Sequence, residues 1–336
     1  MNGRLRGDSL LLDTVHKIFE QNIELLTQTE KAIIYLREQE YEKALSIVAD
    51  TAEYINYVAD AIIQHREYFD LVSVESIMEM LEGILDAKRQ KDFVLLADLL
   101  ELQLVNFICS VQELIMKKED YLAFNELDFI KNSILMQEKI LESDHTLTFF
   151  TEQDRKHQEQ IITNEIKKDL DPAYLLEQGY AVEFSTCGLM TIGSKDENGT
   201  KFYMHTNHSV GKEAFLQARN WYCKDTETYI IYGYGMGYHI GELIKLAPHA
   251  QFEIYESDMN ILKLSCAFSR MTGLFEHENV KMYYDPDFIR IQNRLKEMTE
   301  GDKLSIHYPS FRNIKSKEAK EILLHYIPWA KKLEMC

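Results

Sequence analysis

Proline and glycine are almost missing from the first half of this chain. All five prolines lie at or after Pro172, and between Asp8 and Gln178 the only glycine is Gly83. Because these two residue types break helices, a stretch this long without them is expected to be helical. Apolar residues also recur there at spacings of three to four, as in Ile18, Phe19, Ile23 and Leu26.

Cysteines, positive charge and long apolar runs are scarce as well. The five cysteines are scattered without a Cys-x-x-Cys pair, which favours free thiols in a reducing cytoplasm over a disulfide frame or a zinc site. A net charge of −18 argues against nonspecific nucleic-acid binding, although backbone dipoles could still hold a small anion. No apolar run approaches the roughly 20 residues of a membrane span, and the N-terminus lacks a signal-peptide core. We therefore expect a cytoplasmic protein without a membrane span.

Residues 1–170 are expected to form an all-helical module. Polar turns at residues 37–40 and 88–92 predict breaks between helices without glycine. A shift of 52 residues superimposes these turns and places Tyr41 over Phe93, which suggests a weak internal repeat. A plain helical bundle and a pair of helical hairpins both remain open, and each predicts a packing or partner-docking module.

Residues 171–336 show a different pattern, in which strands and helices alternate. Apolar segments at 180–185, 189–192 and 201–205 predict an antiparallel β element, followed by a helix at 211–223. Four later strands alternate with helices, which is typical of a mainly parallel sheet in a Rossmann-like α/β fold. The strands are expected at 229–232, 252–256, 280–284 and 304–307, and the helices at 238–246, 259–271, 287–298 and 316–327.

The most informative segment is Gly233-Tyr234-Gly235-Met236-Gly237-Tyr238-His239, which joins a strand to a helix. Alternate glycines at such a turn let backbone N–H groups approach a phosphate or carboxylate. Ligands in parallel sheets bind beyond the carboxyl ends of the strands, so the loops after neighbouring strands should line the same edge. The candidate cofactor-binding residues are Gly233, Gly235, Gly237, Tyr238, His239, Glu256 and Asp285, and the candidate substrate-binding residues are His205 and Asn207.

The ligand of this turn is open between several classes. A dinucleotide fingerprint has its third glycine five residues after the first, where Tyr238 stands here, so a nicotinamide dehydrogenase is disfavoured. An S-adenosylmethionine-dependent methyltransferase suits the glycine spacing better, with Glu256 on the ribose and Asp285 near the adenine. Against a methyltransferase, too few strands follow the loop at residues 307–311 to complete the usual seven-stranded sheet. A scaffold that binds nothing is the third alternative, in which Tyr238 and His239 only brace the turn and Asn207 or Ser209 caps a helix.

No catalytic residue or metal site is predicted. His205 and His208 are three residues apart, but no acid pair accompanies them. No Ser-His-Asp or Cys-His constellation is visible either.

Two segments together resemble the motility accessory factor (Maf) family of flagellin-modifying, glycosyltransferase-type proteins. The first is the glycine turn extended through Tyr238-His239, with the strand Phe252-Glu253-Ile254-Tyr255-Glu256 behind it. The second runs from Tyr203 to Ala214 and is similar to the family's Tyr-Leu-His-Ser strand and the helix that follows. The resemblance covers about residues 175–311. Thr206 stands where the family often has serine, and Gly211 lies near its usual proline.

The resemblance implies a Rossmann-like accessory domain from a flagellin-glycosylation or motility context. It implies a nucleotide or nucleotide-sugar at residues 233–237, without an autonomous transferase domain, since the family's larger central domain has no counterpart among these residues. If the protein is an enzyme, a glycosyltransferase-related protein and a methyltransferase are the two expectations. Flagellin or another protein is the partner expected for the helical module.

Overall fold

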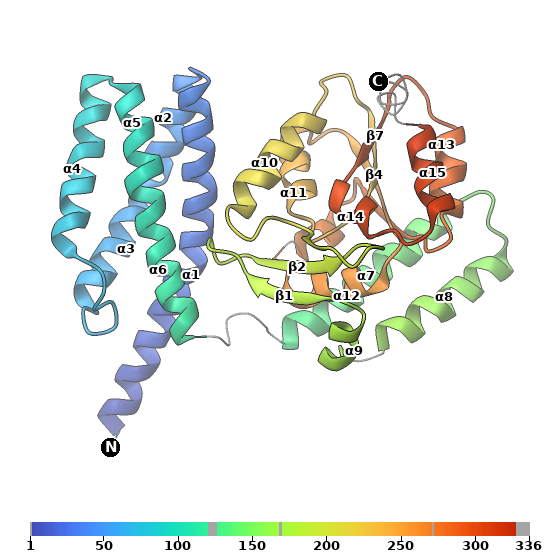
Figure 1. Cartoon of the computed structure of the whole chain (residues 1–336), viewed down its shortest axis with the longest axis horizontal. Coiled ribbons are helices and arrows are strands. Elements are labelled where there is room, and N and C mark those ends of the chain that lie inside the picture. The colour runs from blue at the N-terminus through green and yellow to red at the C-terminus, as the bar shows by residue number, and fades with distance from the viewer. Residues whose placement is uncertain (1, 120–125, 168–169, 271, 327–336) are drawn as a thin grey trace. The chain divides into compact units, whose positions relative to one another are not determined.

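The computed structural model describes residues 2–119, 126–167, 170–270 and 272–326 (Figure 1). Its contacts divide the chain into two compact units. The first contains residues 1–122, 184–189 and 208–212, and the second contains residues 123–183, 190–207 and 213–336. This division groups the helices at 126–145 and 152–167 with the sheet, whereas the sequence places a boundary near residue 170.

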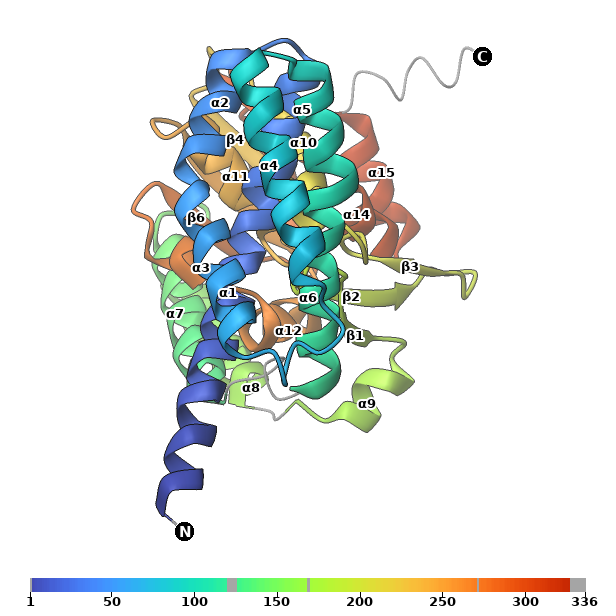
Figure 2. The same cartoon turned by 90° about the vertical axis from the view of Figure 1, so that its left-hand side faces the viewer.

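Between residues 2 and 119, the secondary structure of the first unit is helical (Figure 2). The polar turns expected to separate helices do so, since α1 ends at Arg37 and α4 ends at Gln90. Side chains of Ser73 and Asp92 cap the helices that follow them by accepting backbone N–H groups. The elements are α1 (Asn2–Arg37), α2 (Tyr41–Asp50), α3 (Ala52–Gln64), α4 (Val74–Gln90), α5 (Phe93–Leu99), η1 (Leu100–Leu104) and α6 (Val105–Lys118).

The two turns match each other in detail. Gln39 and Lys91 both adopt left-handed backbone conformations, with φ of 64° and 58°. They are 52 residues apart in sequence, as are Tyr41 and Phe93, whose rings stack with centroids 4.3 Å apart. These features support a pair of related helical hairpins.

One helix in the described part of the chain is long and apolar enough to cross a membrane, by length and composition alone. It is the continuous segment Phe93–Lys118, formed by α5, η1 and α6. Leu96, Leu104 and Val111 on this segment are fully buried among the other helices of the unit. A core helix of a soluble protein passes the same test of length and composition, so this feature is weak evidence for a membrane span.

The second unit is α/β, as expected. Its antiparallel sheet has the order β1-β2-β3, from β1 (Ala181–Phe184), β2 (Met190–Lys195) and β3 (Lys201–Tyr203). Its four-stranded sheet has the order β6-β5-β4-β7, and every neighbouring pair is parallel. These strands are β4 (Thr228–Tyr232), β5 (Gln251–Glu256), β6 (Val280–Tyr284) and β7 (Asp302–Ile306).

Both faces of the parallel sheet are buried. Successive side chains of β4 alternate, so that Tyr229 and Ile231 face one apolar cluster while Ile230 and Tyr232 face the other. The first cluster includes side chains of α7 (Glu126–His145), α8 (Glu152–Lys167), α10 (Val210–Trp221), α11 (Tyr238–Leu246) and α12 (Met259–Phe268). The second includes side chains of α13 (Ile289–Lys296) and α15 (Lys317–His325). The short elements α9 (Pro172–Glu177), η3 (Thr272–Glu276) and α14 (Tyr308–Asn313) complete the unit.

One expected element near the end of the chain differs, and one expected boundary cannot be compared. The loop expected after β7 begins the short helix α14, with Pro309 in its first turn, where a missing backbone N–H costs nothing. The last helix was expected to run to residue 327, which lies outside the described residues.

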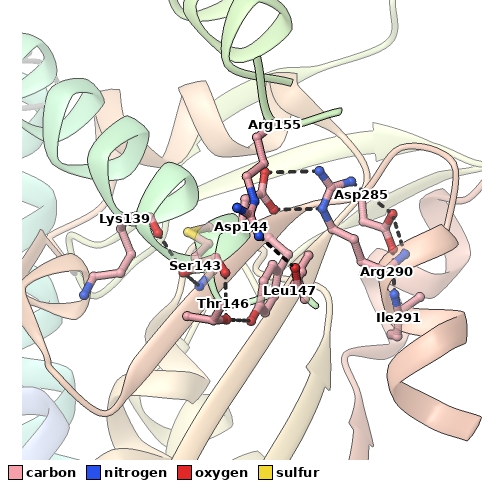
Figure 3. Close-up of polar contacts among 11 residues, drawn as sticks. Lys139, Ser143, Asp144, Thr146, Leu147, Arg155, Asp285, Arg290 and Ile291 are labelled. Carbon is pink, nitrogen blue, oxygen red and sulfur yellow. Dashed lines mark hydrogen bonds and ion pairs between the residues drawn. The ribbon is translucent and has the colours of Figure 1, made fainter. Parts of the chain in front are cut away.

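Polar contacts join α7 to the parallel sheet (Figure 3). Asp144 accepts two hydrogen bonds from the Arg290 guanidinium, at 2.9 and 3.1 Å. Ser143 Oγ accepts the backbone N–H of Met282 at 2.9 Å. These buried contacts explain why α7 groups with the sheet, although the composition of the chain does not change before residue 170.

The described cysteines fit the expectation of free thiols. Cys109, Cys187, Cys223 and Cys266 form no disulfide, and Cys336 lies outside the described residues.

Candidate functional site

The carboxyl ends of the four parallel strands meet at one edge of the sheet. The register pairs Tyr232 of β4 with Tyr255 of β5 and Ile306 of β7, so the loops after these strands start side by side. The chain moves outward from β4 through β5 to β6 and then returns to place β7 on the other side of β4. The crevice between the loops after β4 and β7 is therefore the topological switch point, where open α/β sheets bind ligands.

The glycine turn after β4 has the unusual backbone that its sequence predicts. Gly233, Gly235 and Gly237 have φ of 97°, 54° and 78°. A Cβ on Gly233 would lie 2.3 Å from Cβ of Ser310, and one on Gly235 would lie 3.0 Å from Nε2 of His205. Glycine is required here because neighbouring side chains fill the space against the backbone.

Side chains of the second unit occupy much of the polar backbone of this turn. The Tyr234 N–H donates to Glu256, and the Met236 N–H donates to Nε2 of His205. Ser265 Oγ donates to the carbonyl of Gly235 at 2.5 Å, and Ser269 Oγ donates to that of Met236 at 2.6 Å. A phosphate would have to displace some of these partners to reach the same groups.

Glu256, expected to hold a ribose, accepts three backbone N–H groups. Its Oε2 accepts from Tyr234 at 3.0 Å, and its Oε1 accepts from Ser257 and Asp258 at 2.8 and 3.0 Å. Burial, reinforced by the nearby charge of Asp258, raises the pKa of Glu256 to about 7. The carboxyl group ties the turn to the end of β5.

Asp285, expected near an adenine, caps α13. It accepts the backbone N–H groups of Arg290 and Ile291 at 3.1 and 2.9 Å (Figure 3). The Arg290 guanidinium lies 3.7 Å from its carboxylate. Burial raises the pKa of Asp285, against the opposing effect of these hydrogen bonds and of Arg290. Both acids at this edge therefore have structural partners.

Three histidines that follow three different strands meet at the switch point. His205 follows β3, His239 lies in the first turn of α11, and His307 follows β7. One ring nitrogen from each lies within 4.8 Å of the other two, and all three side chains are buried. The sequence singled out His205 and His239 as site residues and pointed to the loop at residues 307–311, but it did not identify His307 as a site residue that completes a cluster.

The two remaining predicted residues have different surroundings. The Tyr238 hydroxyl donates to the carbonyl of Met190 at 3.0 Å, and its ring packs edge-on against His205 with centroids 5.1 Å apart. This agrees with a bracing role for Tyr238. Asn207 is exposed and hydrogen-bonds with Tyr203, so it does not join the buried cluster.

A cavity of about 560 Å³ runs along the outer edge of β7. Aromatic side chains line it: Trp221, Tyr308, Phe311 and Tyr326. The segment that carries Tyr308 and Phe311 also carries His307 and Ser310, which pack against the glycine turn. The ring of Trp221 contacts His239 edge-on, with centroids 5.1 Å apart. Trp221 thus lines the cavity and also contacts His239.

Comparison of the chain with protein-family models, with curated proteins and with solved structures gave no match. The function has to be argued from the geometry of this edge of the sheet.

Proposed function

We propose that the second unit is a Rossmann-like, Maf-type domain that binds a nucleotide or nucleotide-sugar, in a cytoplasmic flagellin-glycosylation context and without an autonomous transferase. The observation that carries this proposal is the aromatic cavity beside the switch point. Its volume of about 560 Å³ lies within the roughly 300–1,000 Å³ of small-ligand sites. Flat aromatic faces stack on bases, at about 1–3 kcal/mol per base.

One cation beside the cavity is available to an anionic ligand. Lys303 of β7 lines the cavity and supplies this cation. Asp302, which also lines the cavity, makes a bidentate pair with Arg294 at 2.8 and 3.1 Å, but Arg294 also pairs with Glu253 at 2.6 Å and therefore compensates the charge of Asp302 only in part. A diphosphate placed near Lys303 would leave the base or sugar on the aromatic side chains.

In this arrangement the glycine turn supports the wall of the cavity. It lets Ser310 and His307 approach the backbone closely, which positions Tyr308 and Phe311 on the same short helix. Direct contact between phosphate and the turn, as the sequence predicts, requires the turn to exchange existing partners. We therefore place the ligand in the cavity.

The methyltransferase alternative depends on Glu256. A carboxylate that already accepts three backbone N–H groups has little capacity left for two ribose hydroxyls. No contact in the described part of the unit favours this alternative over the nucleotide proposal.

Calorimetric titration with CMP, UDP, GDP, S-adenosylmethionine and NAD tests the proposal. We expect at least one nucleotide to bind, and Tyr308→Ala to weaken that binding about tenfold through lost stacking. Tyr174→Ala is the matched control, because Tyr174 is also exposed but does not line the cavity. Failure of every nucleotide to bind would favour a scaffold, and tight S-adenosylmethionine binding that is lost in Glu256→Gln would favour the methyltransferase.

For the first unit we propose a partner-docking role, with flagellin as the partner implied by the resemblance. A groove of about 680 Å³ lies along α4, η1 and α6. Leu71, which lines it, exposes 82% of its surface, and Leu102 on η1 exposes 66%. Titration of purified flagellin into the protein and its Leu71→Asp variant would show weaker binding by the variant. Equal affinities would exclude this groove.

A further inference from the structure

The side chains of the histidine cluster, His205, His239 and His307, are almost completely buried. His205 and His239 each expose 1% of their surface, and His307 exposes 3%. The rings of His239 and His307 stack with centroids 4.3 Å apart, and His205 lies 5.0 Å from His307. Three imidazoles, which follow β3, β4 and β7 in the chain, therefore pack together at the switch point of the sheet.

Several of their ring nitrogens lack hydrogen-bond partners. Neither ring nitrogen of His239 makes a hydrogen bond of normal geometry, and Nδ1 of His205 makes none. A neutral imidazole always carries one N–H donor and one acceptor, so His239 buries both without a partner of normal geometry. Each such group costs about 1–3 kcal/mol, which calls for an explanation.

We propose that His205, His239 and His307 bind one transition-metal ion, with Zn²⁺ as the best fit. Imidazole nitrogens suit zinc and its neighbours, whereas Mg²⁺ and Ca²⁺ prefer oxygen ligands, which this trio lacks. Zn–N distances of about 2.0–2.1 Å require ligand nitrogens roughly 3.4 Å apart, so the rings move slightly inward on binding. Three protein ligands leave one position of a tetrahedral ion for water or another small ligand.

Polar groups behind two of the rings fit this role. Glu213 Oε1 lies 3.6 Å from Nδ1 of His205, and Ser310 Oγ lies 2.8 Å from Nδ1 of His307. Both rings can then present Nε2 to the ion, in the carboxylate–histidine or hydroxyl–histidine arrangement that orients metal ligands. The Met236 N–H donates to Nε2 of His205 at 3.2 Å, so this nitrogen is unprotonated, and an ion bound there would displace the Met236 N–H from its lone pair.

Such an ion would link the antiparallel sheet to the parallel sheet. His205 follows β3 of the former, while His239 and His307 follow β4 and β7 of the latter. This role is independent of the proposed nucleotide site, because the metal needs only the three buried rings.

Metal analysis of the untagged full-length protein tests the site without any nucleotide. The protein is stripped with a chelator, reloaded with Zn²⁺ or Co²⁺, and freed of excess metal. We expect about one ion per chain and the visible absorption of four-coordinate Co²⁺ with nitrogen ligands. His239→Gln should reduce retained metal at least tenfold, and Glu213→Gln, which keeps all three ligands, should weaken affinity about 10–100-fold.

His208→Gln is the matched control, because His208 lies close to His205 in sequence but is exposed and outside the cluster. It should retain metal like the parent. No bound ion in the parent protein, or equal retention by His239→Gln, would overturn the proposal. If His239→Gln does not fold, X-ray absorption of the parent Zn²⁺ or Co²⁺ form decides, since a site without histidine scattering would refute it.

Discussion

Glu256 links the glycine turn to the next strand with a carboxyl group that has no access to water. It exposes 2% of its surface, yet all its hydrogen-bond partners are backbone N–H groups. These donors favour the carboxylate, while burial favours the protonated acid, and burial has the larger effect on the pKa. The residue therefore changes charge near neutral pH instead of remaining ionised throughout the physiological range.

This shift makes the stability of the second unit depend on pH. Because the pKa of Glu256 is raised from 4.5 to about 7 in the folded state, the folded protein binds more protons than the unfolded chain between these values. The contribution to stability is complete below about pH 4.5 and is lost as the pH rises through about 7, by on the order of 3 kcal/mol. Glu256→Gln does not titrate and lacks this contribution.

Urea unfolding of the parent and Glu256→Gln proteins across this pH range measures the effect. The difference in unfolding free energy should shift in favour of the variant as the pH rises, whatever its value at low pH. A constant difference would mean that the pKa of Glu256 is not raised.

At the scale of elements, the helical unit repeats one hairpin turn with different residues. Lys91 ends α4 in a left-handed conformation, and its N–H donates to carbonyls of the last helical turn. Gln39 occupies the equivalent position after α1 with nearly the same φ. Glycine is normally preferred at such a helix end, because a Cβ is strained there.

Lys91→Gly and Gln39→Gly should therefore each stabilise the first unit, by about 0.5–1 kcal/mol. Far-UV circular dichroism in urea would follow the helices directly. Arg89→Gly is the control, since Arg89 lies inside α4 and glycine should destabilise it there by a similar amount. Loss of stability in both turn variants would show that their backbones are not left-handed.

The strands of the parallel sheet were predictable because each is a short apolar run bounded by polar or glycine-containing turns. Its strand order was not, because nothing local tells whether β7 lies beside β4 or beyond β6. The same limit applies to the site. The sequence indicated His205, His239 and the loop at His307 separately, but their convergence depends on the return of the chain across the sheet. The partners of Glu256 and Asp285 were equally hidden, since free and capped acids look alike in sequence.

At the scale of the whole molecule, the chain passes between its two units more than once. Residues 184–189 and 208–212 belong to the first unit, although the segments around them belong to the second. Within the first unit, the amide of Gln112 donates to the carbonyl oxygens of Phe19 and Cys187, at 3.1 and 3.3 Å. The helices thus gain part of their buried polar contacts from a segment far along the chain.

Two compact units with separate cores need not unfold together. Trp221 lies in the second unit, so a Trp329→Phe background leaves fluorescence as a reporter of that unit alone. Far-UV circular dichroism reports the helices of both units. We expect the urea midpoints of the two signals to differ. Gln112→Ala removes a fully buried amide of the first unit, so it should lower the unfolding free energy measured by dichroism by about 1–3 kcal/mol. The midpoint measured by fluorescence should not change. Coincident transitions that move together in this variant would show instead that the interleaved segments couple the units into one cooperative fold.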